Sequence, residues 1–130
     1  MINEINWYAV FTGALSSFFL GGLWYSPLLF GKVWSREANR PSGEGHSGKV
    51  FGISFVFCLV AATAFAWLLG SRPEVNQAVL KGAVVGFAIV AASFGVNYQF
   101  ANRGFLLWVI DGGYHAAQFM VFGIILGFWH

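Results

Sequence analysis

The residues best suited to chemistry in this 130-residue chain lie inside its last apolar stretch, residues 105–129. Asp111 and His115 are four positions apart, so on a helix they lie one turn apart on the same face, with Gln118 close by. A carboxylate and an imidazole at this spacing can take up, release or pass on a proton. Ionisable side chains within membrane-spanning segments are rare and are candidates for function by default.

Further polar side chains are expected at a similar depth. Asn97 lies a few residues from the level of Asp111 when both are counted from the turn at 101–104, and two more polar residues fall in the same half of the molecule. The candidate intramembrane polar site therefore comprises Tyr25, Ser26, Asn97, Asp111, His115 and Gln118. Such side chains either hold helices together by hydrogen bonds or bind a proton, an ion or a small solute.

The composition is typical of a membrane protein. The chain is 58% hydrophobic and only 9% charged, whereas soluble domains are about one quarter charged. Its length suits one domain, so residues 1–130 are expected to form a single transmembrane domain in contact with membrane lipid. The net charge of +2 does not favour a nucleic acid as a partner.

The apolar runs predict four membrane-spanning helices, because a bilayer core requires about 20 apolar residues per helix. The expected spans are about 7–30, 50–69, 78–100 and 105–129, with a polar loop at 31–48. The predicted fold class is therefore an all-α integral membrane four-helix bundle. Pro27 is expected to kink or end the first span, and residues 31–40 are expected to form a short helix at the membrane surface. The short turn at 101–104 predicts that the last two spans are antiparallel neighbours.

Basic residues are distributed unevenly between the two sides of the predicted bundle. The loops after the first and third spans hold five of them, Lys32, Arg36, Arg40, Lys49 and Arg103, and the opposite side holds Arg72 and Lys81. Because basic loops normally stay in the cytoplasm, we predict a multi-pass protein of the cell membrane with both termini outside the cytoplasm. Small residues at four-residue spacing, such as Gly82 and Gly86, also favour close helix packing and a homo-oligomer.

No cofactor, metal site or catalytic residue is predicted. Cys58 is the only cysteine and lies in an apolar run, so it is expected to pack in the core, and His46 lies in the polar loop without other ligands at metal-binding spacing. The chain contains no nucleophile elbow, zinc motif, phosphate loop or dinucleotide fingerprint. These observations favour a protein that is not an enzyme without excluding an enzyme.

Two short segments show a weak likeness to each other. Gly22 to Tyr25 and Gly95 to Tyr98 both begin with glycine and end with tyrosine, near the ends of the first and third spans. Two identities over four positions are too few to predict a repeated helix pair.

The segment Gly22-Leu23-Trp24-Tyr25-Ser26-Pro27-Leu28-Leu29-Phe30-Gly31-Lys32-Val33-Trp34 resembles the opening signature of the domain-of-unknown-function 1761 family. Asp111-Gly112-Gly113-Tyr114-His115 and the run from Gly123 to Trp129 resemble its closing segment. The resemblance implies a small bacterial-type membrane protein with four helices. It implies no catalytic or binding role for any residue.

Three classes of function stay open from the sequence. The first is an oligomeric transport or permeation protein for an ion, a proton or a small solute, with Asp111 and His115 on the pathway. Four short spans leave little room for an internal cavity, so this hypothesis requires a homo-oligomer. The second is a structural or accessory membrane protein that binds lipid or a larger complex. The third is a membrane enzyme acting on a hydrophobic substrate, with Ser26 or Tyr25 beside the Asp111–His115 pair.

Overall fold

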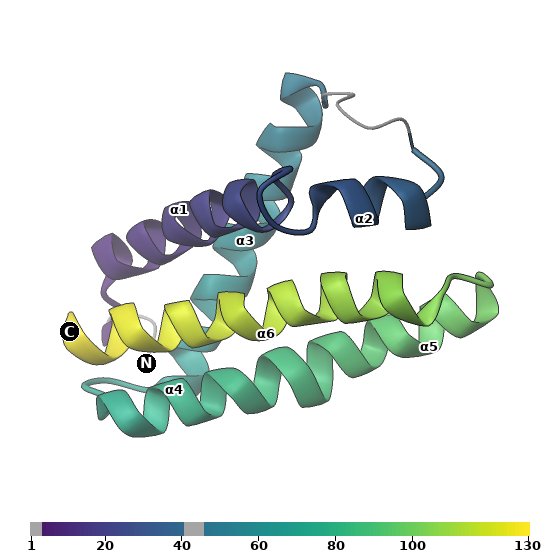
Figure 1. Ribbon diagram of the computed structural model, residues 1–130. Coiled ribbons are helices and arrows are strands. Elements are labelled where there is room, and N and C mark those ends of the chain that lie inside the picture. The colour runs from purple at the N-terminus through teal and green to yellow at the C-terminus, as the bar shows by residue number, and fades with distance from the viewer. Residues whose placement is uncertain (1–3, 41–45) are drawn as a thin grey trace.

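The computed structural model describes residues 4–40 and 46–130, and these residues form helices joined by short connections (Figure 1). The helices are α1 (Trp7–Trp24), α2 (Gly31–Glu37), α3 (Gly48–Leu69), α4 (Val75–Ala83), η2 (Val84–Ala91), α5 (Ala92–Phe100) and α6 (Phe105–Phe128). The elements α4, η2 and α5 follow one another without a break and make one long helix. No strand occurs in the described residues, which confirms the predicted all-α class.

Three helices of the described chain are long and apolar enough to cross a membrane: Gly48–Leu69, Val75–Phe100 and Phe105–Phe128. The helix α1 is not among them. It ends at Trp24, six residues before the end expected for the first span, and its 18 residues measure only about 27 Å at 1.5 Å each. The predicted bundle of four spanning helices is therefore supported for three helices, and a short helix, α2, occupies part of the predicted polar loop.

The end of α1 is fixed by a tight turn at residues 25–31, which carries the proline expected to interrupt the helix. The backbone N–H of Gly31 donates to the carbonyl oxygen of Ser26 over 2.9 Å and closes this turn. A Cβ atom at position 31 would overlap the backbone of Tyr25 and Ser26, so glycine is required there. At the other end of α1, the side chain of Asn6 caps the helix by accepting from the N–H of Ala9 over 3.1 Å.

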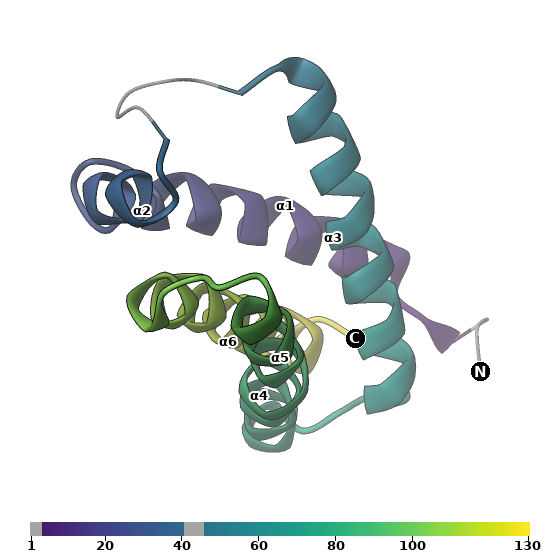
Figure 2. The ribbon, with the colours of Figure 1, turned by 90° about the vertical axis from the view of Figure 1, so that its right-hand side faces the viewer.

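The helix α6 lies at the centre of the molecule and runs antiparallel to the long helix α4–η2–α5, as the short turn predicted (Figures 1 and 2). Glycines allow the two backbones to approach closely. A Cβ atom at Gly123 would lie 2.5 Å from the carbonyl oxygen of Ala78, and one at Gly86 would lie 2.6 Å from that of His115. Small residues therefore form this interface, as the four-residue spacing indicated.

The helix α3 crosses the others at a steep angle in both ribbon views (Figures 1 and 2). Its C-terminal half packs against α1 and α6, where Phe65 is fully buried beside Phe119 and Phe122. Its N-terminal half is exposed and apolar, with Phe57 69% accessible. An apolar surface of this kind suits a hydrocarbon environment better than water.

Candidate functional site

Asp111 on α6 is held by two tyrosines from other parts of the chain. The Tyr25 hydroxyl donates to Oδ1 over 2.7 Å, and the Tyr98 hydroxyl donates to Oδ2 over 2.5 Å. Hydrogen bonds to a charged acceptor are about twice as strong as bonds between neutral groups. This three-residue cluster, Tyr25–Asp111–Tyr98, is called the Asp111 clamp below, because it joins the end of α1, α5 and α6.

The two tyrosines are positioned by their own surroundings. Tyr25 caps the C-terminus of α1, where its N–H donates to the carbonyl oxygen of Gly21, and its ring lies edge-on to Trp34 at a centroid distance of 5.8 Å. Tyr98 stacks on Phe94, one turn earlier on α5, at 6.1 Å. Next to the clamp, the indole N–H of Trp24 donates to the carbonyl oxygen of Ile110 over 2.9 Å. The ring contacts with Trp34 and Phe94 hold the two phenol rings in the positions from which their hydroxyl groups bond to Asp111.

Two of the predicted site residues, Asn97 and Ser26, make no hydrogen bond to another predicted site residue among the residues that the structure describes. Asn97 is exposed, and in the described part of the chain its neighbour Tyr98 contacts Asp111 instead. Ser26 is half-buried, but its hydroxyl donates to the carbonyl oxygen of Leu23 over 2.7 Å and thus caps its own helix. Tyr114 and Tyr98 also belong to the site, and neither was predicted as a site residue from the sequence. For Tyr98, the Gly22–Tyr25 and Gly95–Tyr98 likeness was the available signal, since the two tyrosines that end these segments donate to the same carboxylate.

His115 and Gln118 belong to a second polar cluster nearer the middle of α6. Nδ1 of His115 lies 2.8 Å from Oε1 of Gln118, and the Gln118 amide nitrogen donates to the hydroxyl of Ser17 over 3.3 Å and to Sγ of Cys58 over 3.5 Å. Gln118 and Ser17 are buried. Because an amide oxygen only accepts, this arrangement puts the hydrogen of His115 on Nδ1. Cys58 thus combines its expected packing role with a weak hydrogen bond.

Tyr114 connects the two clusters by ring contacts. Its ring lies 5.6 Å from that of Tyr25 and 4.9 Å from that of His115, and its hydroxyl donates to the carbonyl oxygen of Ser17 over 2.9 Å. In the described residues, His115 makes its side-chain hydrogen bond with Gln118 and not with Asp111. Asp111 and His115 therefore belong to two neighbouring hydrogen-bonded clusters on one helix.

The polar side chains of α6 form a column along one face. Asp111, Tyr114, His115 and Gln118 follow the i, i+3, i+4, i+7 pattern that aligns residues on a helix. Beyond Gln118 the same region of the bundle is closed by aromatic rings, since Phe119 lies 5.5 Å from Phe65 and 5.2 Å from Phe122. The polar column therefore runs along only about a third of α6 and ends against an apolar layer.

Metal binding finds no support in the described part of the chain, where no group of three histidine, cysteine or acidic side chains is close enough to hold an ion. His46 is exposed and lies edge-on to Phe51 at 5.9 Å. The residues present in the polar column offer carboxylate, phenol, imidazole and amide groups. Chemically, this set can hold a proton or hydrogen-bond a small polar group.

Helices of membrane-spanning length and a half-buried carboxylate held between them define a small α-helical protein of the membrane type. The chain belongs to the family described as protein of unknown function (DUF1761), whose family model matches residues 8–127. This confirms the family that the Trp24–Tyr25–Ser26–Pro27 region and the closing segment indicated. No curated protein and no solved structure matches the chain.

Proposed function

We propose that the protein is a structural or accessory membrane protein, and that the Asp111 clamp holds its helices in a fixed arrangement. The observation that carries this proposal is that both carboxylate oxygens of Asp111 accept hydrogen bonds from tyrosines on other elements. A carboxylate with both oxygens engaged in this way is arranged to stabilise the bundle.

The apolar layer beyond Gln118 also supports a structural role. A permeation pathway through one protomer needs polar or water-filled surroundings along its whole length. Here the rings of Phe65, Phe119 and Phe122 follow directly after the polar column, and Phe65 and Phe122 are fully buried. The polar column of α6 is therefore short and closed by apolar side chains, which suits a hydrogen-bonded core better than a channel.

The placement in the membrane that we propose is multi-pass, in the cell membrane, with α1 as a fourth and shorter crossing and both termini outside the cytoplasm. Supporting this, the start of α1 and the end of α6 lie together, where the amide of Asn6 donates to the carbonyl oxygen of Trp129 over 3.1 Å (Figure 1). The basic helix α2 lies beside the turn at 101–104, because a Cβ atom at Gly104 would be 3.6 Å from Oε2 of Glu37. The basic residues of α2 and of the turn at 101–104 therefore lie at the same end of the molecule.

A second candidate is transport of a proton, an ion or a small solute by a homo-oligomer. The observation in its favour is the aligned column of Asp111, Tyr114, His115 and Gln118. In this version a second copy completes the pathway that the apolar layer closes within one protomer. The exposed apolar half of α3 offers a surface to a second copy, which must compete with membrane lipid for it.

Equilibrium unfolding of the purified full chain in detergent, compared between the native protein and Asp111→Leu, tests the structural proposal. Leucine has a similar volume but accepts no hydrogen bond, so both phenols lose their partner. We expect a loss of at least about 1 kcal/mol in the free energy of unfolding. Glu74→Gln, an exposed acidic residue before α4 without a side-chain capping bond, is the matched control. Equal stability of Asp111→Leu and the control would refute the proposal.

A further inference from the structure

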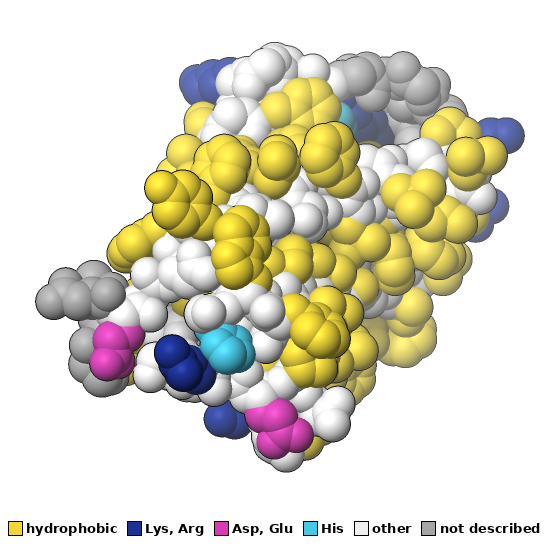
Figure 3. Space-filling model, turned by 90° about the vertical axis from the view of Figure 1, so that its left-hand side faces the viewer, with side chains coloured by type: hydrophobic (Ala, Val, Ile, Leu, Met, Phe, Trp, Pro, Cys, Tyr) yellow, Lys and Arg dark blue, Asp and Glu magenta, His cyan; other side chains and the backbone are white. Residues whose placement is uncertain are grey.

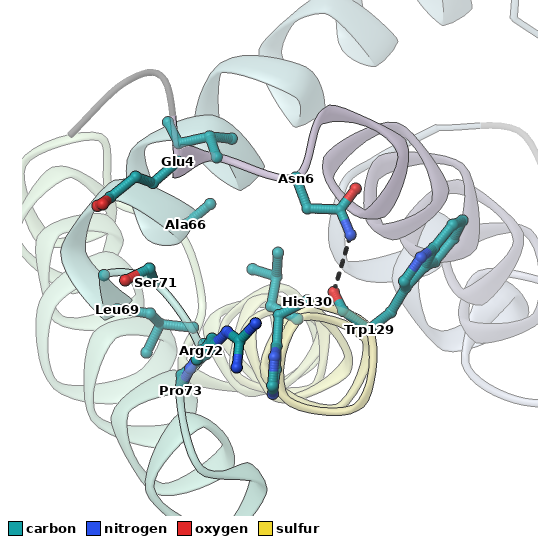
Figure 4. A pocket seen from close by; sticks show the side chains of 12 residues that line it. Glu4, Asn6, Ala66, Leu69, Ser71, Arg72, Pro73, Trp129 and His130 are labelled. Atoms are coloured by element: carbon teal, nitrogen blue, oxygen red, sulfur yellow. Dashed lines mark hydrogen bonds between the residues drawn. The ribbon is translucent and has the colours of Figure 1, made fainter.

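A hollow of about 300 Å³ opens at the end of the molecule where residues 4–6 meet the C-terminal end of α6, at the opposite end of α6 from the Asp111 clamp (Figures 1 and 4). The N-terminal segment before α1, the end of α3, the connection from α3 to α4 and the end of α6 all contribute to its wall. Its volume is at the lower end of the range of small-molecule sites and can take the headgroup of a larger molecule.

The lining divides into an apolar part and a charged part. Ala66, Leu69 and Leu126 supply apolar surface, and the indole of Trp129 stands at the edge, where membrane proteins place amphipathic rings. Arg72 and His130 lie side by side on the opposite part of the wall, and Glu4 lies across the hollow from them in Figure 4. Figure 3 shows that charged and histidine side chains gather at this end of the molecule, next to hydrophobic surface.

Arg72 is the strongest candidate for binding an anion here. In the described part of the chain its guanidinium makes no ion pair and no hydrogen bond, although it lines a hollow. The backbone φ angle of Arg72 is +52°, in the left-handed region that residues other than glycine, asparagine and aspartate rarely adopt. The connection between two helices of membrane length thus holds a cation at the depth where lipid headgroups lie, in a backbone conformation that most residues would avoid.

We propose that this terminal hollow binds the phosphate group of an amphiphile, with Arg72 as the anion-binding residue. Guanidinium groups match phosphate oxygens through paired hydrogen bonds, and the apolar wall accommodates the carbon skeleton beside the phosphate. The phosphate belongs to a membrane phospholipid or to a soluble phosphate ester. The proposal does not depend on the role of the Asp111 clamp, which lies at the other end of α6.

The test measures ligand binding to the detergent-purified full chain by native mass spectrometry. The probes are a phosphatidylglycerol, the diacylglycerol with the same acyl chains, which lacks the phosphate, and glycerol 3-phosphate. The key variant is Arg72→Gly, because glycine adopts a positive φ without strain and so removes the charge without disturbing the fold. Arg72→Asn serves as a second variant that tolerates the same backbone conformation, and Arg103→Gln is the control at the other end.

We expect the native protein to bind phosphatidylglycerol in preference to diacylglycerol. Arg72→Gly and Arg72→Asn should weaken phosphatidylglycerol binding at least about fivefold, which corresponds to one cation near a lipid phosphate, and Arg103→Gln should leave it unchanged. Displacement of the lipid by glycerol 3-phosphate would identify a soluble ester as a second source of the group, and no displacement would identify the lipid as the source. If both Arg72 variants bind every probe as the native protein does, the proposal is wrong.

Discussion

The Tyr25 hydroxyl lies 2.7 Å from Oδ1 of Asp111 and joins two residues that are 86 positions apart in the chain. This bond fixes the end of α1 against α6, and the Tyr98 bond to Oδ2 fixes α5 against the same carboxylate. One acidic side chain therefore determines how three elements of the bundle meet.

Replacing Tyr25 or Tyr98 with phenylalanine removes one donor of the clamp and keeps the ring. We expect each change to lower the free energy of unfolding in detergent by about 0.6 to 1.7 kcal/mol, the range of hydrogen bonds between membrane helices. Tyr8→Phe is the matched control, since Tyr8 on α1 is 78% accessible. A double-mutant cycle of Tyr25→Phe with Asp111→Leu should give a coupling of at least about 0.5 kcal/mol. Purely additive effects would show that the two residues do not stabilise each other.

Gly82→Ala is expected to separate α4 from α6. A Cβ atom at position 82 would overlap the backbone carbonyl of Phe119, which cannot move away as a side chain can. The expected cost is about 1–3 kcal/mol in the free energy of unfolding. Gly52→Ala in the exposed part of α3 is the control, because nothing lies within 4 Å of its added methyl group. There we expect no loss, or a gain of up to about 1 kcal/mol from helix propensity, and an equal cost at both positions would contradict the interface.

The indole N–H of Trp108 donates to the carbonyl oxygen of Ala91 over 2.7 Å, at the end of the π-helical segment Val84–Ala91. Trp108→Phe removes this bond and keeps an aromatic ring. We expect faster backbone hydrogen exchange in residues 84–92, because irregular helical turns depend on side chains that satisfy their carbonyl groups. Trp67→Phe, at a tryptophan that is 49% accessible on α3, provides the control. Unchanged exchange in Trp108→Phe would mean that the π-helical segment does not need this bond.

Asn97 was predicted from its depth alone, counted from the turn at 101–104, and the π-helical segment determines which residue near that depth faces α6. Asn97 follows Gly86 by 11 positions, which is about three turns at 3.6 residues per turn, so a regular helix would turn both toward α6. A π-turn contains more residues than an α-turn, and every face after it is rotated. Tyr98 consequently faces Asp111. The segment Val84–Ala91 is uniformly apolar, so nothing in its sequence distinguishes a π-helix from an α-helix.

Other features were predictable because they depend on local chemistry. The proline at position 27 indicated the interruption of the first helix, and the short turn before Phe105 predicted the antiparallel pair of α4–η2–α5 and α6. Tyr25 and Asp111 were both expected in one polar site, and they are in contact. The steep crossing of α3 was not predictable, because hydropathy indicates the length of a helix but not its tilt.

The most direct test of the account is proton flux into liposomes that contain the purified protein, measured with an enclosed pH-sensitive dye for the native chain, Asp111→Asn and the control Glu74→Gln. In our proposal Asp111 has a structural role. We therefore predict the same flux as in protein-free liposomes for all three proteins, together with a lower free energy of unfolding for Asp111→Asn alone. Proton flux in the native protein that disappears in Asp111→Asn but persists in Glu74→Gln would contradict this proposal.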